Sequence, residues 1–325
     1  MKNILSVRVA IFLLAAGLLL YPLVLTGAFY RDVGVTFLLA AISASAWNIV
    51  GGYAGQVSVG HSMFFGVGAY APLLTYTLLG WPPMAGIPAG IVLSMGLAVL
   101  IGTPTFRLSG HYFSMATIAV AELIRIFIGT WDFVGAAIGL QGPATARGWW
   151  DLTFRNELPY YYIFLAVLGI VLATTAAIER RRFGFYLRAI KASERAARSL
   201  GVPVRQTKIK ALVLSAAFTS VAGSLYVIKT GFIDPDSGFG ILISVQMLIV
   251  AALGGAGTLF GPLIGALILI PIQTATNSWF GGGGSGLTYI LYGGIIVLIA
   301  RFEPGGLSEM WHRISPRIRK RLHAA

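Results

Sequence analysis

The 325-residue chain contains no cysteine and has few charged residues. Without cysteine it can form no disulfide, thiolate nucleophile or cysteine-ligated metal site. Charged residues make up 11% of the chain and hydrophobic residues 57%, with a mean hydropathy of +0.81, whereas soluble domains are about 25% charged. A water-soluble fold could not bury this much apolar surface, so the sequence predicts an all-α polytopic membrane protein.

Acidic residues are scarce as well. The chain has 11 Asp and Glu against 24 Lys and Arg, which gives a net charge of +13. In a soluble protein such basicity would suggest a nucleic-acid partner. Here the basic residues gather in a hydrophilic stretch at 179–210 and in the C-terminal tail at 303–325. The positive-inside rule of membrane topology explains this distribution better, so we expect no nucleic-acid partner.

Several catalytic and transport signatures are also absent from the sequence. It has no G-x-x-x-x-G-K-[ST] phosphate loop, so we expect no ATP site of that kind in this chain. It has no H-E-x-x-H or G-x-S-x-G hydrolase motif. No span carries the regularly spaced arginines of a voltage sensor. We therefore expect no catalytic residue, no metal site and no cofactor in this chain.

Long apolar segments follow one another along the chain. A membrane-spanning helix needs about 20 apolar residues. The sequence predicts about ten spans, at 9–30, 33–50, 63–79, 85–106, 111–129, 159–178, 208–229, 241–256, 259–276 and 287–302. The first is longer than the apolar region of about 7–15 residues in a signal peptide, so we expect it to be retained.

The placement of lysine and arginine predicts the orientation of these spans. Both termini, Arg107 and the stretch 179–210 are expected in the cytoplasm, and the loops at 130–158 and 230–240 outside. This single assignment suits every loop and requires an even number of spans.

Two glycine-rich stretches interrupt the spans. The first is GGYAGQVSVGHSMFFGVGAY at 51–70 and the second is GGAGTLFGPLIGA at 254–266. Irregular backbone at membrane depth survives only where it is buried in protein or lines a polar cavity. We interpret both as broken or re-entrant elements beside a translocation path; the alternative is a tight glycine-lined helix contact. The candidate path residues are Gln56, Ser58, Gly60, His61, Phe65, Gly254 and Gly255.

Individual polar residues leave alternatives open. His61 fits a path residue and a hydrogen-bonded spacer equally well. Glu122 and Arg125 lie three residues apart, hence on one face of the span 111–129. They could form a proton or substrate relay, or a mutual ion pair with Arg125 reaching towards the outer interface. The sequence favours the ion pair, because it shows one such pair and proton-coupled carriers usually need more groups.

The basic stretch contains a predicted short helix. Ser193 is a suitable N-cap for the segment that runs to Leu200, and Gly201 and Pro203 are stop signals. The chain is then expected to return to the membrane at Lys208. This helix is either a solvated element between topology anchors or a surface that fits a soluble partner.

Three sequences in this region resemble the cytoplasmic coupling loop of ABC-importer permeases. They are SERAARSLGV at 193–202, TKIKALVLSA at 207–216 and VAGSLY at 221–226. The stretch NIVGGYAGQVSVGHSMFFGVGAY at 48–70 and the second glycine-rich stretch are similar to permeases of the branched-chain (hydrophobic) amino-acid uptake family. The resemblance covers nearly the whole chain. The family often has an aromatic residue where this chain has Leu212.

The resemblance implies that residues 1–325 form a single transmembrane permease domain in a bacterial plasma (inner) membrane. Its implied partners are a second, similar permease subunit, two cytoplasmic ATPases that carry ATP and Mg²⁺, an extracytoplasmic substrate-binding protein and the lipid bilayer. The residues expected to couple to the ATPases are Glu194, Ala197, Leu200, Gly201 and Lys208.

The expected substrates are branched-chain or other small hydrophobic amino acids. Urea, short amides and other small solutes remain alternatives within the same class of permease. Two other classes also remain open. One is a secondary carrier that uses Glu122 for ion coupling, and the other is a membrane-embedded enzyme or scaffold whose basic segments bind anionic lipid.

Overall fold

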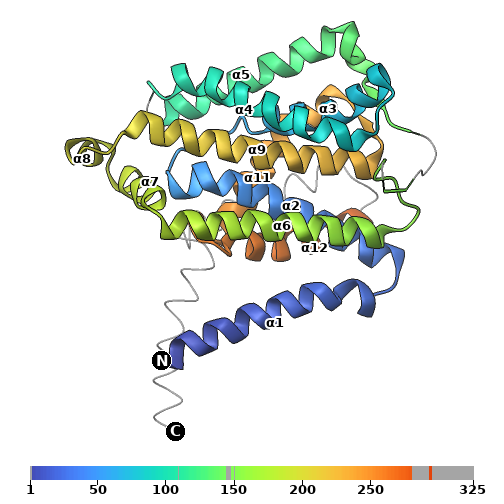
Figure 1. Ribbon diagram of the computed structural model, residues 1–325, viewed down its shortest axis with the longest axis horizontal. Coiled ribbons are helices and arrows are strands. Elements are labelled where there is room, and N and C mark those ends of the chain that lie inside the picture. Colours follow the sequence, from blue (N-terminus) through green and yellow to red (C-terminus); the bar gives the residue numbers. More distant parts are fainter. Residues whose placement is uncertain (1, 109, 144–147, 150, 280–292, 295–325) are drawn as a thin grey trace.

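The structure, a computed structural model, describes residues 2–108, 110–143, 148–149, 151–279 and 293–294. Long helices run roughly side by side in a bundle, with α1 set apart along one side (Figure 1). The first half contains α1 (Lys2–Val24), α2 (Ala28–Asn48), the π-helical turn η1 (Ile49–Tyr53), α3 (Ser62–Leu79), η2 (Pro83–Ala85), α4 (Gly86–Thr105) and α5 (His111–Thr130).

The second half begins with a loop that holds two short 3-10 turns and one short strand. Its elements are η3 (Asp132–Val134), η4 (Ala136–Ile138), β1 (Leu140–Gln141), α6 (Glu157–Arg180), α7 (Arg182–Ala192), α8 (Glu194–Ser199), α9 (Val204–Thr230), β2 (Phe232–Ile233), α10 (Pro235–Phe239), α11 (Ile241–Gly254) and α12 (Gly261–Trp279). β1 pairs antiparallel with β2, with Leu140 opposite Ile233. This pairing fastens the loop to the chain that follows α9.

Within the described residues, seven helical segments are long and apolar enough to cross a membrane. They are Ala28–Tyr53, Ser62–Leu79, Pro83–Thr105, His111–Thr130, Glu157–Arg180, Val204–Thr230 and Pro235–Gly254. Leu13–Val24 and Gly261–Asn277 are shorter apolar helices. These nine coincide with the first nine predicted spans, and the tenth, 287–302, lies almost entirely outside the described residues. The chain is a multi-pass helical membrane protein; the number ten remains a prediction.

Successive long helices run in opposite directions, so the loops fall into two groups (Figure 1). One end of the bundle, on the left in Figure 1, carries α7, α8 and the start of α1. The other end carries the loop that follows α5 and the start of α6. Which of these two ends faces the cytoplasm stays a prediction from the distribution of basic residues.

Close backbone contacts hold the centre of the bundle together. α9 packs against α3 and α4 along small residues. A Cβ atom added to Gly68 would lie 2.0 Å from the carbonyl oxygen of Ser220, and one added to Gly223 would lie 2.0 Å from that of Phe65. No side chain fits at these crossings, so glycine allows α3 and α9 to meet backbone to backbone, as small residues do in membrane bundles.

Candidate translocation site and coupling surface

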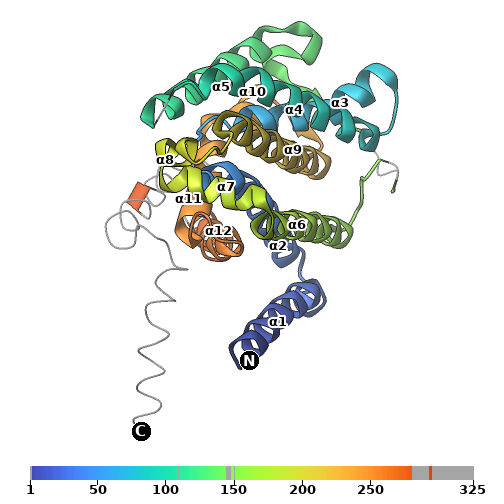
Figure 2. The same cartoon turned by 60° about the vertical axis from the view of Figure 1, so that its left-hand side comes forward.

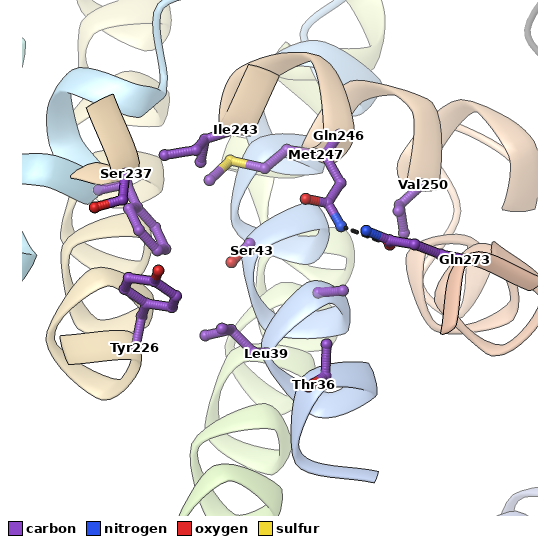
Figure 3. Close-up of a pocket in the computed structure, with 12 residues that line it drawn as sticks. Thr36, Leu39, Ser43, Tyr226, Ser237, Ile243, Gln246, Met247, Val250 and Gln273 are labelled. Carbon is purple, nitrogen blue, oxygen red and sulfur yellow. Dashed lines mark hydrogen bonds between the residues drawn. The ribbon is translucent and has the colours of Figure 1, made fainter. Parts of the chain in front are cut away.

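A cavity of about 290 Å³ lies among the helices of the bundle (Figure 3). Its walls come from α2, α3, α9, α10, α11 and α12. The residues that line it are Thr36, Leu39, Ala40, Ser43, Phe65, Tyr226, Ser237, Ile243, Gln246, Met247, Val250 and Gln273. The volume is near the lower limit of about 300 Å³ that is typical of small-molecule sites.

The cavity wall combines apolar and polar groups and carries no ionisable acid or base apart from a tyrosine. Gln246 Nε2 donates a hydrogen bond of 3.4 Å to Gln273 Oε1 and so joins α11 to α12 (Figure 3). The rings of Phe65 and Tyr226 lie 5.5 Å apart at another wall. Burying a net charge in such a place would be costly. The cavity therefore suits a small solute without net charge that has both an apolar part and hydrogen-bonding groups.

Of the predicted path residues, Phe65 is the one that lines this cavity. His61 lies elsewhere, fully buried at the start of α3. Its Nδ1 is 3.0 Å from Ser58 Oγ and its Nε2 is 2.8 Å from Ser215 Oγ. Ser215 donates its own proton to the carbonyl oxygen of Ala46, at 2.6 Å. Nε2 of His61 must therefore carry the proton, and Nδ1 accepts from Ser58. This geometry favours the hydrogen-bonded spacer for His61.

Other residues of the first break contact protein in part, although Val57 is 44% exposed. The backbone N–H of Gln56 donates to the carbonyl oxygen of Val50 at 3.1 Å. A Cβ atom added to Gly60 would lie 2.3 Å from the carbonyl oxygen of Thr117, so the break lies directly on α5. The irregular backbone is thus sheltered by protein at Ser58 and Gly60, and a transport role for Gln56, Ser58 and Gly60 stays a prediction.

The second break shapes the turn between α11 and α12. A Cβ atom on Gly254 would lie 1.7 Å from the carbonyl oxygen of Gly261. Gly255 has φ +122°, a conformation that favours glycine. Neither residue lines the cavity, so their part in a path also stays a prediction.

Sequence reasoning missed most of the polar residues of the cavity. Gln246 stands within a mostly apolar helix, and an amide in such a run is a signal in its own right, whereas Gln273 opens the more polar end of α12. Ser43 and Tyr226 gave no comparable signal, because the serines and tyrosines of the spans are numerous and the face that each helix turns inward is not visible in the sequence.

The short helix predicted in the basic stretch is confirmed as α8. The Ser193 side chain accepts a hydrogen bond of 3.3 Å from the backbone N–H of Ala196 and caps the helix. Gly201 follows with φ +79°. Ala197 is buried with Ile190 of α7 and Val204 of α9 in a small apolar cluster. α8 is thus held in place by its neighbours on both sides.

The return to the membrane expected at Lys208 stays a prediction, and the helix that contains Lys208 starts four residues before it. α9 begins at Val204, and Lys208, one turn inside it, is only 1% exposed. Its ammonium lies 2.5 Å from Glu194 Oε2 and 5.8 Å from the ring centre of Phe106. The first half of the basic stretch also forms a helix, α7, that the sequence reasoning did not predict. Charge on its outer face hid its apolar positions, such as Leu187, which is buried.

Leu200 is the most exposed residue of this surface among those expected to couple to a partner. It directly follows α8 and is 83% exposed. This large apolar side chain is open to contact by a partner, although a single exposed leucine does not by itself mark an interface.

The intramembrane ion pair predicted from spacing is confirmed. Arg125 Nη2 lies 2.5 Å from Glu122 Oε1, and the Arg125 guanidinium also binds Asp236 of α10. Lys229 and Asp32 form a second pair. Both pairs lie towards the end of the bundle opposite α8, since α5 and α9 end there (Figure 1). The Arg125 pair therefore fastens α5 to α10.

Comparison with known proteins decides the family. Residues 30–300 match the family described as "Branched-chain amino acid transport system / permease component". The chain belongs to this family. The matched region runs from α2 to α12. It therefore includes both the cavity and α8.

Curated relatives agree with this membership. The chain is 27% identical to the high-affinity branched-chain amino acid transport system permease protein LivM of Escherichia coli, over 86% of this chain and 70% of that protein. It is 24% identical to the corresponding permease BraD of Pseudomonas aeruginosa, over 85% and 92%. LivH of Escherichia coli is 26% identical over 73% and 80%. Among solved structures, PsaBC from Streptococcus pneumoniae in complex with Fab gives a TM-score of 0.46 at 16% identity, over 89% of this chain and 96% of that chain.

Proposed function

We propose that this chain is the transmembrane permease subunit of an ATP-driven importer for branched-chain or other small hydrophobic amino acids, in a bacterial plasma membrane. Family membership over residues 30–300 supports the permease role. The names of LivM, BraD and LivH support this substrate class. The chain has similarity to both LivH and LivM of one organism, which supports pairing with a second permease of the same kind.

The observation that carries the substrate class is the uncharged cavity. A branched-chain amino acid carries no net charge, so it avoids the cost of burying an unbalanced ion. Its aliphatic side chain fits the wall formed by Leu39, Ile243 and Met247. Its carboxylate can accept hydrogen bonds from the amides of Gln246 and Gln273, and its ammonium can donate to their oxygens. Urea and short amides are also uncharged and can form hydrogen bonds with Gln246 and Gln273, although urea has no apolar part, and they are the second candidate substrates.

The energy source is proposed to be a pair of cytoplasmic ATPases bound at α8, with ATP and Mg²⁺ held on those subunits. The exposed Leu200 would contact the ATPase. The Glu194–Lys208 pair would pass its movement to α9, which reaches the cavity through Tyr226. An extracytoplasmic binding protein would deliver the substrate at the opposite end, near the loop between α5 and α6.

Uptake by cells tests this function. In the native bacterium, deletion of the gene should abolish high-affinity uptake of radiolabelled leucine, and the gene returned on a plasmid should restore it. Excess isoleucine and valine should compete with leucine, while lysine and glutamate should not. Strong competition by urea or acetamide would instead select the second candidate substrates. Unchanged leucine, urea and acetamide uptake after deletion would contradict the proposal.

A further inference from the structure

A single buried side chain joins the two glycine-rich breaks. Asn48, the last residue of α2, is 1% exposed. Its Oδ1 accepts a hydrogen bond of 2.7 Å from the backbone N–H of Gly257, and its Nδ2 donates one of 2.9 Å to the carbonyl oxygen of Thr258. These partners lie 209 and 210 residues further along the chain. Because one end of the amide accepts and the other donates, its orientation is fixed.

The backbones of the two breaks approach each other too closely at the clasp for a side chain on Gly52. A Cβ atom on Gly52 would lie 1.8 Å from Asn48 Oδ1 and 2.4 Å from the backbone nitrogen of Gly257. Gly257 has φ +90°, which favours glycine. Glycine at positions 52 and 257 thus allows the side chain of Asn48 to reach the backbone of Gly257 and Thr258. We name the contact of Asn48 with Gly257 and Thr258 the Asn48 clasp.

α7 contacts both sides of the clasp. Lys191 Nζ donates a hydrogen bond of 3.4 Å to the carbonyl oxygen of Ala256 in the second break. Its Cγ lies 3.0 Å from the position of a Cβ atom on Gly55 in the first break. Lys191 stands two residues before Ser193, the N-cap of α8. A displacement of α8 therefore reaches both breaks through one side chain.

The first break is also tied to the end of α6, which α7 in turn contacts. The hydroxyl of Tyr53 donates a hydrogen bond of 2.6 Å to Glu179 Oε1, and Arg188 of α7 donates one of 2.9 Å to the backbone carbonyl of Glu179. Figure 2 turns this end of the bundle, with α7 and α8, towards the viewer. The clasp thus lies on the side where the coupling helices are.

The clasp also ties together two helices that form the cavity wall. Ser43 lines the cavity and stands five residues before Asn48, the last residue of α2. Val250 also lines the cavity and stands four residues before Gly254, the last residue of α11. A separation of the two breaks would therefore move these two helix ends apart.

We propose that the Asn48 clasp is the closure of the translocation path on the side of the coupling helices, and that Lys191 is the positioning residue through which α7 opens it. This inference rests on the proposed import function. In the resting importer the clasp holds the two breaks together. Movement of α7 and α8 on the ATPase displaces Lys191, the Asn48 hydrogen bonds break, and the substrate leaves the cavity.

The test measures coupling in the complete importer, purified with its native ATPases and binding protein and reconstituted in liposomes. Asn48→Asp keeps the size and the acceptor but replaces the donor to Thr258 by a second acceptor. Lys191→Met keeps the apolar stem and removes the donor to Ala256. Two readouts are taken, namely the number of leucine molecules imported per ATP hydrolysed and the rate of leucine efflux without ATP.

We expect Asn48→Asp to lower leucine import per ATP by about tenfold and to raise efflux, since the hydrogen bond to Thr258 is lost and a carboxylate oxygen then faces the Thr258 carbonyl oxygen. Lys191→Met should lower import per ATP without raising efflux, because the clasp itself remains. Two variants serve as matched controls and should behave like the wild type. Ser45→Ala lies on the same face of α2 as Asn48, but its hydroxyl has no hydrogen-bond partner among the described residues. Lys210→Met removes a lysine at an exposed position of α9.

A purely structural role for Asn48 would reduce the amount of assembled complex but leave import per ATP unchanged in the complexes that form. That result, or unchanged coupling in both variants, would overturn the inference. Failure of the wild-type complex to import leucine, urea or acetamide would instead contradict the proposed function, so the two failures are distinguishable.

Discussion

The ammonium of Lys208 lies 2.5 Å from Glu194 Oε2, although Lys208 is buried in a membrane helix and Glu194 begins the short helix α8. A buried lysine must be paired, because an isolated charge in this position is strongly unfavourable. The pair therefore connects α8 firmly to α9. Since Tyr226 of α9 lines the cavity, one rigid helix extends from the coupling surface to the candidate translocation site.

Removal of the acid from this pair should destabilise the coupling surface. Glu194→Gln leaves the buried ammonium of Lys208 without its counter-charge, and we expect a loss of about 2 kcal/mol, less than for a fully buried pair because Glu194 is partly exposed. Thermal unfolding in detergent should show it. Lys208→Met removes the buried charge itself and leaves the carboxylate of Glu194, which is partly exposed, to be solvated by water. It should therefore cost less stability than Glu194→Gln. A larger loss in Lys208→Met would contradict the account.

Leu200 should anchor the ATPase. Replacing it with glutamate removes the apolar contact without disturbing α8, because the side chain is 83% exposed. Burial of a leucine contributes about 1.5–3 kcal/mol, so the ATPase should co-purify at least about tenfold more weakly. Ser199→Ala, on the neighbouring residue, is the control. Equal ATPase recovery with Leu200→Glu would place the docking surface elsewhere.

Gly201→Asp should abolish uptake while the protein remains in the membrane. Gly201 has φ +79° and no atom within 4 Å of an added Cβ, and aspartate tolerates this backbone region better than most residues. The added side chain and charge would then act on the partner rather than on the fold. Membrane content by immunoblot and leucine uptake separate the two effects, and normal uptake would count against a docking role for this turn.

Gln246 should help to hold the substrate. Gln246→Leu removes one hydrogen-bonding group from the cavity wall at similar size, and we expect about fivefold weaker apparent leucine affinity of the importer. Thr274→Val changes a neighbour of Gln273 that does not line the cavity and should have no such effect. The measurement is the leucine concentration dependence of uptake in proteoliposomes at saturating binding protein. Identical curves for both variants would exclude this cavity as a substrate site.

Gly68 should be irreplaceable for packing. In Gly68→Ala the new methyl would meet the Ser220 carbonyl at 2.0 Å, so α3 and α9 must separate, at a cost of about 2 kcal/mol or more. Gly96→Ala on α4 meets no atom within 4 Å and should leave stability unchanged or raise it by about 0.5 kcal/mol. Unfolding temperatures of the two variants in detergent provide the comparison. Equal stability would refute the close crossing.

The sequence predicted those features that rest on local chemistry. Hydropathy and length located the long helices, and Ser193 and Gly201 marked the limits of α8 because a capping hydroxyl and a left-handed turn are local requirements. Spacing alone was enough to pair Glu122 with Arg125.

The cavity could not be predicted in the same way. Its lining depends on how each helix is rotated, and the apolar residues of a membrane helix face lipid and protein alike. The sequence therefore pointed to the glycine-rich breaks, of which Phe65 alone reaches the cavity. Asn48 was also missed, since its partners are 209 and 210 residues away and no local pattern connects them.

The central claim is that this chain imports its substrate with energy received from ATPases at α8. Leucine uptake into proteoliposomes tests it most directly, with the chain reconstituted either alone or together with its second permease, ATPases and binding protein. We predict uptake only in the complete set and only with Mg-ATP, and its loss when Leu200→Glu replaces the wild-type chain. Uptake by the isolated chain, driven by an ion gradient and abolished by Glu122→Gln, would contradict the claim.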